Sequence, residues 1–183
     1  MNRWILALAI FISAPAASAV ELALGPETLL QAETGQRRLV GGGFGFGVDL
    51  RGKVHDALHL GLWADVSRAA YPDAHVAFGS VRLGTRIQTA DGRLRPFLGL
   101  FLENVFDGTR PSFEAAERWR VGEELGLELI GSTYESSTLL RFGVALRAAQ
   151  PVDVNAPDTP FLNLGLVVSA KVAFELGRAK RAK

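Results

Sequence analysis

The sequence contains no cysteine, so the protein has no disulfide bonds, no thiol chemistry and no lipid-modified N-terminal cysteine. It also has no excess of charge of either sign, because 20 Lys and Arg residues face 19 Asp and Glu residues. A protein that binds nucleic acid usually carries a clear basic excess. The balance therefore gives no indication of a nucleic-acid partner. The basic end of the chain, 178–183, is interpreted as a solvated tail.

The sequence has no apolar run long enough to cross a bilayer as a helix, which needs about 20 residues. Its first residues are MNRWILALAIFISAPAASAVEL, with a basic start at Arg3, a short apolar core and small residues at Ala17 and Ala19. This layout is typical of a secretory signal peptide with cleavage after Ala19. We expect a signal peptide at 1–19 and one domain over 20–177.

Five glycines occur in the stretch VGGGFGFGVDL, residues 40–50. A dinucleotide-binding G-x-G-x-x-G motif would need a third glycine where Phe46 stands, and no G-K-[ST] follows. The glycines at odd positions instead alternate with bulky apolar residues. Side chains of a β-strand point to opposite faces with period two, so this stretch is predicted to be a strand with one bare face.

The same alternation recurs along the chain, and the helical spacing of three and four is absent. The segments are long compared with strands of soluble proteins, which usually have about 5–6 residues, whereas strands that cross a membrane need about 9–11. The sequence therefore predicts an all-β protein. Seven segments alternate clearly: 38–51, 57–67, 76–89, 93–106, 118–131, 138–149 and 161–176.

An eighth strand is predicted at 20–30, although Pro26 interrupts its pattern. Proline suits an edge or a bulge better than a paired strand. Connections along the chain alternate between short ones and generally longer ones, of which 108–117 and 150–160 are the longest. In outer-membrane barrels the periplasmic turns are short and the extracellular loops longer. Eight strands would thus place both chain ends in the periplasm.

The two faces of the predicted strands differ in kind. One carries Leu, Val and Phe, and the other carries glycine and charge, which in a membrane barrel would line the interior. An eight-stranded barrel is just wide enough for its side chains to fill, so we expect paired charges and a plugged lumen. The predicted charge network is Asp49, Asp65, Arg82, Arg86, Arg95, Glu103, Glu124, Glu128, Arg141, Arg147, Lys171 and Glu175, with Gly41, Gly43, Gly45, Gly47 and Trp63 as packing residues.

The leader, the long alternating strands and the inward Arg/Glu set resemble the small eight-stranded outer-membrane β-barrels of the OmpA/OmpX type. The resemblance implies a transmembrane, up-and-down antiparallel barrel in the cell outer membrane, with membrane lipid around it. It also implies recognition by the barrel-assembly machinery through a terminal aromatic residue. Phe174 is near the end of the last strand, but seven residues follow that strand.

The sequence predicts a structural or surface-interaction role, with loops 108–117 and 150–160 contacting a surface glycolipid or a protein. A small porin or ligand-binding barrel, a soluble periplasmic lipocalin-like barrel and a lipid-modifying hydrolase remain alternatives. For the hydrolase, His59 is the one inward histidine, and the acid and serine on its own strand are too distant to form a triad with it. We expect no enzymatic activity, no cofactor and no metal site.

Overall fold

The computed structural model describes residues 20–34, 39–72, 75–106, 119–132, 138–152 and 162–176. The signal peptide predicted at 1–19 and the tail at 178–183 lie outside these ranges. All the described regular structure is β-sheet, in strands 13 to 17 residues long. The strands are β1 (Val20–Thr34), β2 (Leu39–His55), β3 (Leu58–Tyr71), β4 (Val76–Thr89), β5 (Leu94–Phe106), β6 (Trp119–Ser132), β7 (Thr138–Pro151) and β8 (Leu162–Leu176).

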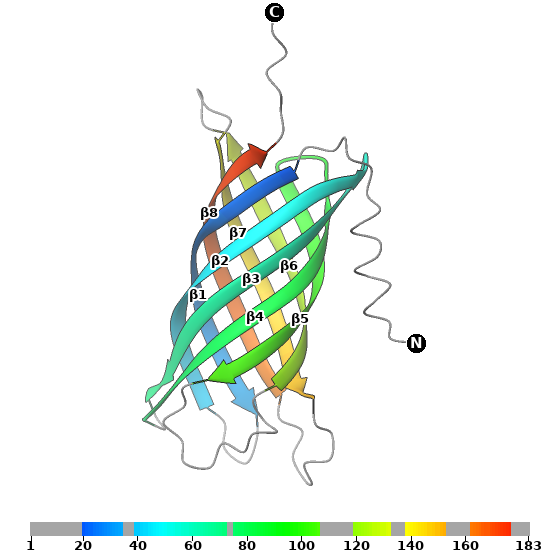
Figure 1. Cartoon of the computed structure of the whole chain (residues 1–183). Helices are drawn as coiled ribbons and strands as arrows, with labels where there is room; N and C mark the ends of the chain where they lie inside the picture. Colours follow the sequence, from blue (N-terminus) through cyan, green and yellow to red (C-terminus); the bar gives the residue numbers. More distant parts are fainter. Residues whose placement is uncertain are drawn as a thin grey trace, which may run out of the picture.

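Each strand pairs with its neighbours in sequence, and β1 pairs with β8, so the sheet closes into an antiparallel barrel (Figure 1). The prediction of an eight-stranded, all-β, up-and-down barrel is confirmed. Closure removes the unpaired edges that an open sheet would present. The segment predicted at 20–30 is the first strand, and it continues to Thr34.

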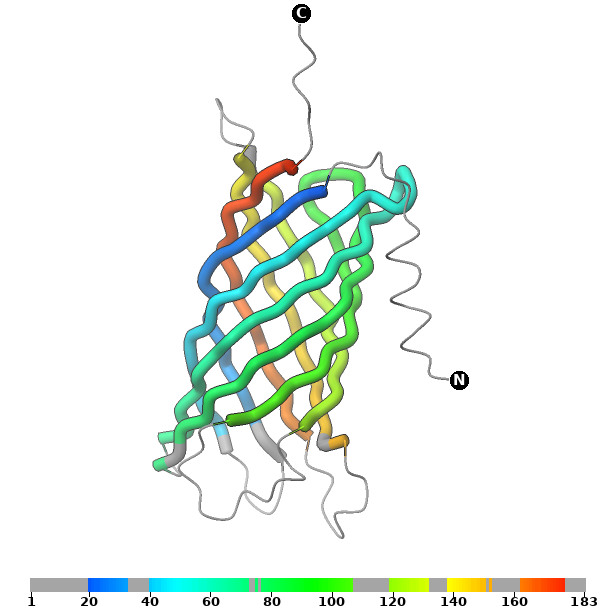
Figure 2. The backbone as a smooth tube through the Cα atoms, viewed as in Figure 1, coloured from blue at the N-terminus to red at the C-terminus, as the bar shows by residue number. Residues whose placement is uncertain are grey.

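The start of β1 and the end of β8 lie at the same end of the barrel (Figure 2). We call this the chain-end rim, and the opposite one the loop-end rim. The turns that connect β2 to β3 and β4 to β5 are at the chain-end rim. In the second of these turns Gly92 has a φ of 82°, a left-handed conformation that a residue with a side chain rarely adopts.

Pro26 lies in β1, at the seam that closes the barrel. The pairing of β1 with β8 is interrupted at Gly25 and Pro26 and resumes where Glu27 faces Ser169. Proline has no N–H to donate, so a break at this point is expected. The pairing of β1 with β2 continues through both residues. The barrel thus accommodates the proline inside a paired strand and not at an open edge.

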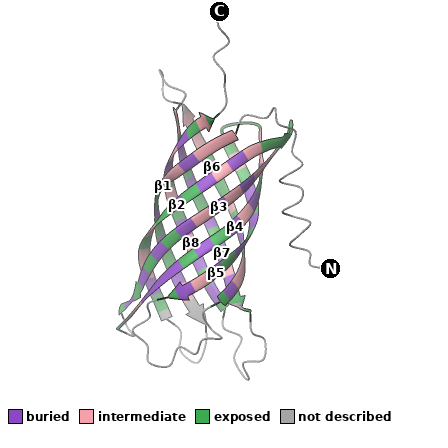
Figure 3. Cartoon of the chain, viewed as in Figure 1, coloured by how far each residue is buried: buried purple, intermediate pink, exposed green. Residues whose placement is uncertain are grey.

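Burial alternates along most of each strand, with more and less buried residues succeeding one another (Figure 3). The outward positions are mostly large and apolar, and Phe44 is the most exposed of them at 77%. The inward positions are mostly charged, polar or glycine. In the part of the chain that the structure describes, no helix is long and apolar enough to cross a membrane.

Candidate functional site

Charged side chains form one continuous network along the inside of the barrel, which we call the lumen network. Every member has at least one ion pair within 4.0 Å, and most are almost completely buried. Seven members are acidic and seven are basic, so the formal charges cancel. They are Glu21, Glu27, Asp49, Asp65, Glu103, Glu124 and Glu128, with Arg51, Arg82, Arg86, Arg120, Arg141, Arg147 and Lys171.

Toward the chain-end rim, the network is centred on Glu128 of β6. Arg51 reaches across from β2 and donates to both Glu128 carboxylate oxygens, at 2.5 and 2.7 Å. Gln88 donates to the same carboxylate at 2.8 Å, and Arg141 does so at 3.2 Å. Arg141 also pairs with Glu21 near the start of β1. The Glu128 carboxylate thereby joins four strands, β2, β4, β6 and β7. Its ion pair with Arg51 is bidentate, which is the stronger form of such a pair.

Arg147 of β7 occupies the middle of the lumen, where it contacts three carboxylates. Its Nη1 atom is 2.9 Å from Asp65 on β3, its Nε atom is 3.3 Å from Glu124, and its Nη2 atom is 3.5 Å from Glu27. The guanidinium carbon lies 4.6 Å from the ring centroid of Trp63. Both the charge and the flat face of this side chain are therefore in contact with neighbours.

A second group in the middle of the lumen is built around Asp49 of β2. Lys171 of β8 lies between Asp49 and Glu27, with its Nζ atom 2.8 Å from each carboxylate. Arg86 of β4 contacts Glu124 at 2.8 Å and Asp49 at 3.5 Å. Its guanidinium carbon is also 4.0 Å from the ring centroid of Phe97. Most of these contacts join strands that are not neighbours in the sheet, so the side chains meet within the lumen.

Toward the loop-end rim the charges become fewer. Arg82 pairs with Asp65 at 3.0 Å and with Glu103 at 2.7 Å, and Arg120 is 3.8 Å from Glu103. Beyond them is a small apolar group, the loop-end cluster, in which the rings of Tyr71 and Phe78 meet edge to face at 5.5 Å. The other members of that cluster are Ala69 and Val105.

The structure places Trp63 inside the barrel, where it is only 2% exposed. Its ring lies over Gly84 of β4, because a Cβ added at Gly84 would come within 2.5 Å of the ring. The ring is not among the nearest neighbours of Gly41, Gly43, Gly45 and Gly47 of the adjacent strand β2, with which the sequence grouped it as packing residues. Those glycines make room for other groups instead: Gly41 for Tyr71, Gly47 for Glu27 and Lys171, and Gly43 and Gly45 for the backbone of β3.

Most of the predicted network residues are brought together, but two are less buried than expected. Arg95 is only half-buried, and its Nε atom donates to the carbonyl of Gly92 in the turn. Glu175 is also half-buried, near the end of β8. Both stand so close to the chain-end rim that water reaches them. Inward parity is thus not sufficient to bury a charged side chain completely when it lies near a rim.

Sequence reasoning missed four members of the network: Glu21, Glu27, Arg51 and Arg120. Glu21 and Glu27 share one parity in β1, whose pattern Pro26 obscures. Arg51 has the parity of Asp49 and is the last residue of the strand predicted at 38–51. Arg120 has the parity of Glu124. All four lie within the predicted strands, so parity applied to every charged residue of those strands would have found them.

Within the residues that the structure describes, the histidines do not form a catalytic or metal-binding arrangement. His55 and His59 have the H-x-x-x-H spacing, which places two ligands on one face of a helix, but here they stand on the two sides of a β-turn. The Nδ1 atom of His59 has no hydrogen-bond partner within the described ranges. The same ranges contain no group of three side chains suited to holding a metal ion.

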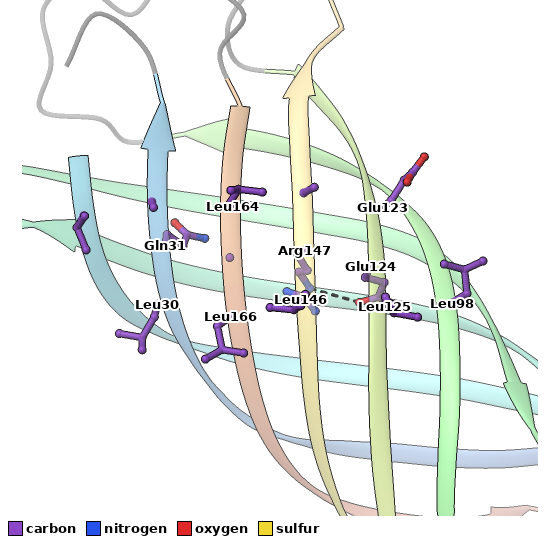
Figure 4. A pocket seen from close by; sticks show the side chains of 14 residues that line it. Leu30, Gln31, Leu98, Glu123, Glu124, Leu125, Leu146, Arg147, Leu164 and Leu166 are labelled. Atoms are coloured by element: carbon purple, nitrogen blue, oxygen red, sulfur yellow. Dashed lines mark hydrogen bonds and ion pairs between the residues drawn. The ribbon is translucent and has the colours of Figure 1, made fainter. Parts of the chain in front are cut away.

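A groove of about 690 Å³ is on the outer wall and not in the lumen. It spans β5 to β8 and β1, and its lining includes the outward leucines Leu98, Leu125 and Leu166 (Figure 4). Arg147 and Glu124, which are joined by an ion pair in that view, lie behind it at inward positions. Glu123, next to Glu124 in sequence, is exposed on the outer face.

No protein-family model matches this chain, and no curated protein matches its sequence. Solved structures are similar in fold. Neisserial surface protein A is 14% identical with a TM-score of 0.54, covering 85% of this chain and 97% of its own. Outer membrane protein OprG from Pseudomonas aeruginosa is 12% identical with a TM-score of 0.51, covering 87% and 96%. The fold is that of the small eight-stranded outer-membrane barrels of the OmpA/OmpX type.

Proposed function

We propose that the protein is an integral outer-membrane β-barrel with a filled lumen and a structural or surface-interaction role. The single observation that carries the proposal is the polarity of the wall, which is apolar outside and charged inside. The chain-end rim would face the periplasm, where an exported chain begins its insertion. The loop-end rim, where the segments 108–117 and 150–160 are attached, would face the cell exterior.

The polarity favours a membrane barrel over a soluble lipocalin-like one. Soluble proteins rarely expose continuous apolar patches of more than a few hundred Å², whereas here the large apolar residues follow one another around the whole outer wall. In lipid these side chains have a favourable environment, and the inward charges are shielded from it. A soluble barrel would need the reverse arrangement.

The lumen network favours a filled barrel over a small porin. Arg51 contacts Glu128 and Arg147 contacts Asp65, both across the interior. An ion moving along the barrel would have to displace such pairs, and each side chain left without its partner would be a costly unpaired charge. The same packing leaves His59 without the oriented acid that a hydrolase needs.

We propose membrane lipid as the environment of the wall, and the barrel-assembly machinery as the partner that inserts it. Outward-facing Phe174, two residues before the end of β8, is the candidate aromatic for that recognition. The loops at 108–117 and 150–160 remain the proposed contact for a glycolipid or protein at the cell surface. Except for residues 150–152, they lie outside the described residues.

Membrane fractionation of the expressed full chain tests the proposal. We expect the protein in the outer-membrane fraction, migrating differently on gels before and after boiling because a closed barrel resists detergent unfolding. Recovery in the soluble periplasm would contradict the membrane assignment. Purified, folded protein in planar bilayers should show no steady conductance, and an ohmic channel would contradict the filled lumen.

A further inference from the structure

The seam between β1 and β8 closes the barrel, and its backbone pairing is broken at one point. Pairing stops after Leu24, which faces Val172, and resumes where Glu27 faces Ser169. No other strand pair that the structure describes is interrupted within its length, and a register shift occurs only near the end of the β2–β3 pair. Pro26 lacks the N–H that an unbroken ladder would use here. The backbone therefore holds this part of the seam less firmly than the rest of the wall.

The outward side chains add little to hold the seam at this point. A groove of about 490 Å³ on the outer wall extends from β5 to β1, and Pro26, Thr28, Val168 and Ala170 are among its lining residues. Pro26 and Ala170 flank the break on the outward face. Their side chains are short and carry no polar group that could join the two strands. Closure at the break therefore depends on the groups inside the barrel.

Inside the barrel, Lys171 joins the two sides of the seam. It stands on β8 against Gly25, where a Cβ added to the glycine would lie 2.8 Å from the Cα atom of Lys171. The Nζ atom of Lys171 is 2.8 Å from the carboxylate of Glu27 on β1 and 2.8 Å from that of Asp49 on β2. The side chain thus crosses the break and reaches beyond β1 to the next strand. All three charged side chains are almost completely buried.

The surroundings of Lys171 fit this bridging position closely. A Cβ added at Gly47 would lie 2.5 Å from a carboxylate oxygen of Glu27 and 2.9 Å from the Nζ atom of Lys171, so the bare glycine makes room for the pair. Arg147 of β7 also reaches Glu27 across the seam, but at 3.5 Å. A buried charge left without its partner is costly, so these ion pairs oppose the separation of β1 from β8.

We propose that Lys171 is a latch that holds the β1–β8 seam closed where Pro26 interrupts its backbone pairing. On the lumen side, the ion pairs of Lys171 supply the closure that the backbone lacks. When they are broken, the wall opens locally at this point, between the outer groove and the lumen network, and the other strand pairs stay intact. A barrel with a filled lumen thus has one place at which it can open sideways. This property belongs to the closed barrel itself and goes beyond its proposed role.

Hydrogen–deuterium exchange with mass spectrometry, on the folded protein in detergent micelles, tests the latch, because amide exchange reports the local opening of a strand. Lys171→Met removes the cation and keeps an unbranched side chain. We expect exchange over 24–28 and 168–172 to become at least about tenfold faster in this variant, with little change in the other strands. Unchanged exchange at the seam, or an equal rise in all strands, would overturn the latch.

Arg82→Met is the matched control. Arg82 is also a buried cation between two carboxylates, those of Asp65 at 3.0 Å and Glu103 at 2.7 Å. Its partners stand on β3 and β5, whose pairing with β4 is continuous. Exchange at the seam should therefore remain at the wild-type rate. If Arg82→Met opened the seam as much as Lys171→Met, any lost lumen charge would do so, and Lys171 would have no special role there.

Replacement of the proline tests the other half of the proposal. Pro26→Ala restores the missing N–H, so exchange at the seam should become slower than in the wild type. The double variant Pro26→Ala with Lys171→Met should return to about the wild-type rate. Pro96→Ala changes another outward proline, on β5, and should leave the seam unchanged.

Heat-modifiable migration verifies that each variant is folded. A double variant that exchanges at the seam as fast as Lys171→Met alone would contradict the link between the latch and the proline. Pro26→Ala keeps every charge of the lumen, so its comparison with the wild type decides the matter even if Lys171→Met does not fold. Equal seam exchange in Pro26→Ala and the wild type would overturn the proposal.

Discussion

The middle of the lumen and its loop end are filled in different ways. In the middle, Arg147 and Lys171 each contact at least two carboxylates, and every group depends on the position of several others. At the loop end, Tyr71 and Phe78 pack edge to face, and apolar contacts replace most of the ion pairs. Buried charges tolerate little loss, because a single deletion leaves several partners unpaired. Apolar groups can partly repack.

The largest effect is expected from Arg147→Ala in the middle of the lumen. The variant leaves Asp65, Glu124 and Glu27 with one cation fewer and removes the group that lies over Trp63. Breaking a buried pair costs about 3–5 kcal/mol, and we expect a loss of that size in the free energy of unfolding. Urea unfolding of the barrel in lipid vesicles measures it.

Lys53→Ala is the control for that variant. Lys53 also pairs with a carboxylate, that of Asp56, at 2.8 Å, but both side chains are well exposed to solvent. Its hydrogen bond holds the pKa of Asp56 below the usual value without burying either group. The urea midpoint should not change measurably in this variant. Equal midpoints for Lys53→Ala and Arg147→Ala would contradict the difference between buried and exposed pairs.

The next largest effect is expected from Trp63→Ala, which removes a ring packed against Phe101 at 5.8 Å and against two guanidinium groups. Truncation of a buried Trp costs about 3–5 kcal/mol, and we expect the lower end because Arg86 and Arg147 can move into the space. Unfolding in vesicles gives the value. Trp119→Ala, which truncates an outward tryptophan, should cost clearly less, and a reversed order would place Trp63 outside the packed lumen.

Gly84→Ala tests whether that ring needs the glycine beneath it. The new Cβ would lie 2.5 Å from the Trp63 ring and 2.7 Å from the Leu100 carbonyl oxygen, so the ring must shift. Overpacking of this kind costs about 1–3 kcal/mol. Gly52→Ala is the matched control, since nothing lies within 4 Å of its added Cβ. Unfolding midpoints should fall for Gly84→Ala alone, and a fall in both would indicate a general effect of glycine in strands.

The smallest effect is expected at the loop end, from Tyr71→Phe. The ring and its contact with Phe78 remain, and only the hydroxyl group that donates to Gln31 at 2.9 Å is lost. A single neutral hydrogen bond contributes about 0.5–1.5 kcal/mol, so a loss of about 1 kcal/mol is expected in vesicle unfolding. If Tyr71→Phe lowered the free energy of unfolding as much as Arg147→Ala, the side chains at the loop end would depend on one another as strongly as those in the middle.

Much of the barrel was predictable because a β-strand alternates its side chains with period two. Segments such as 76–89 and 161–176 agree with the observed strands to within one residue. The same parity placed Glu124 and Arg147 inside. It missed lumen charges where the alternation was weak, as around Glu27. It also included Arg95, which is only half-buried, because parity says nothing about how close a residue lies to a rim.

The sequence by itself determined that the strands are long, that they alternate and that one face is apolar while the other is charged. Only the tertiary structure decided which charges meet: that Arg51 of β2 pairs with Glu128 of β6, and that Trp63 covers Gly84 of β4. Parity is a local property of each strand and can be read from neighbouring residues. Partners across the lumen depend on the closure and register of all eight strands together.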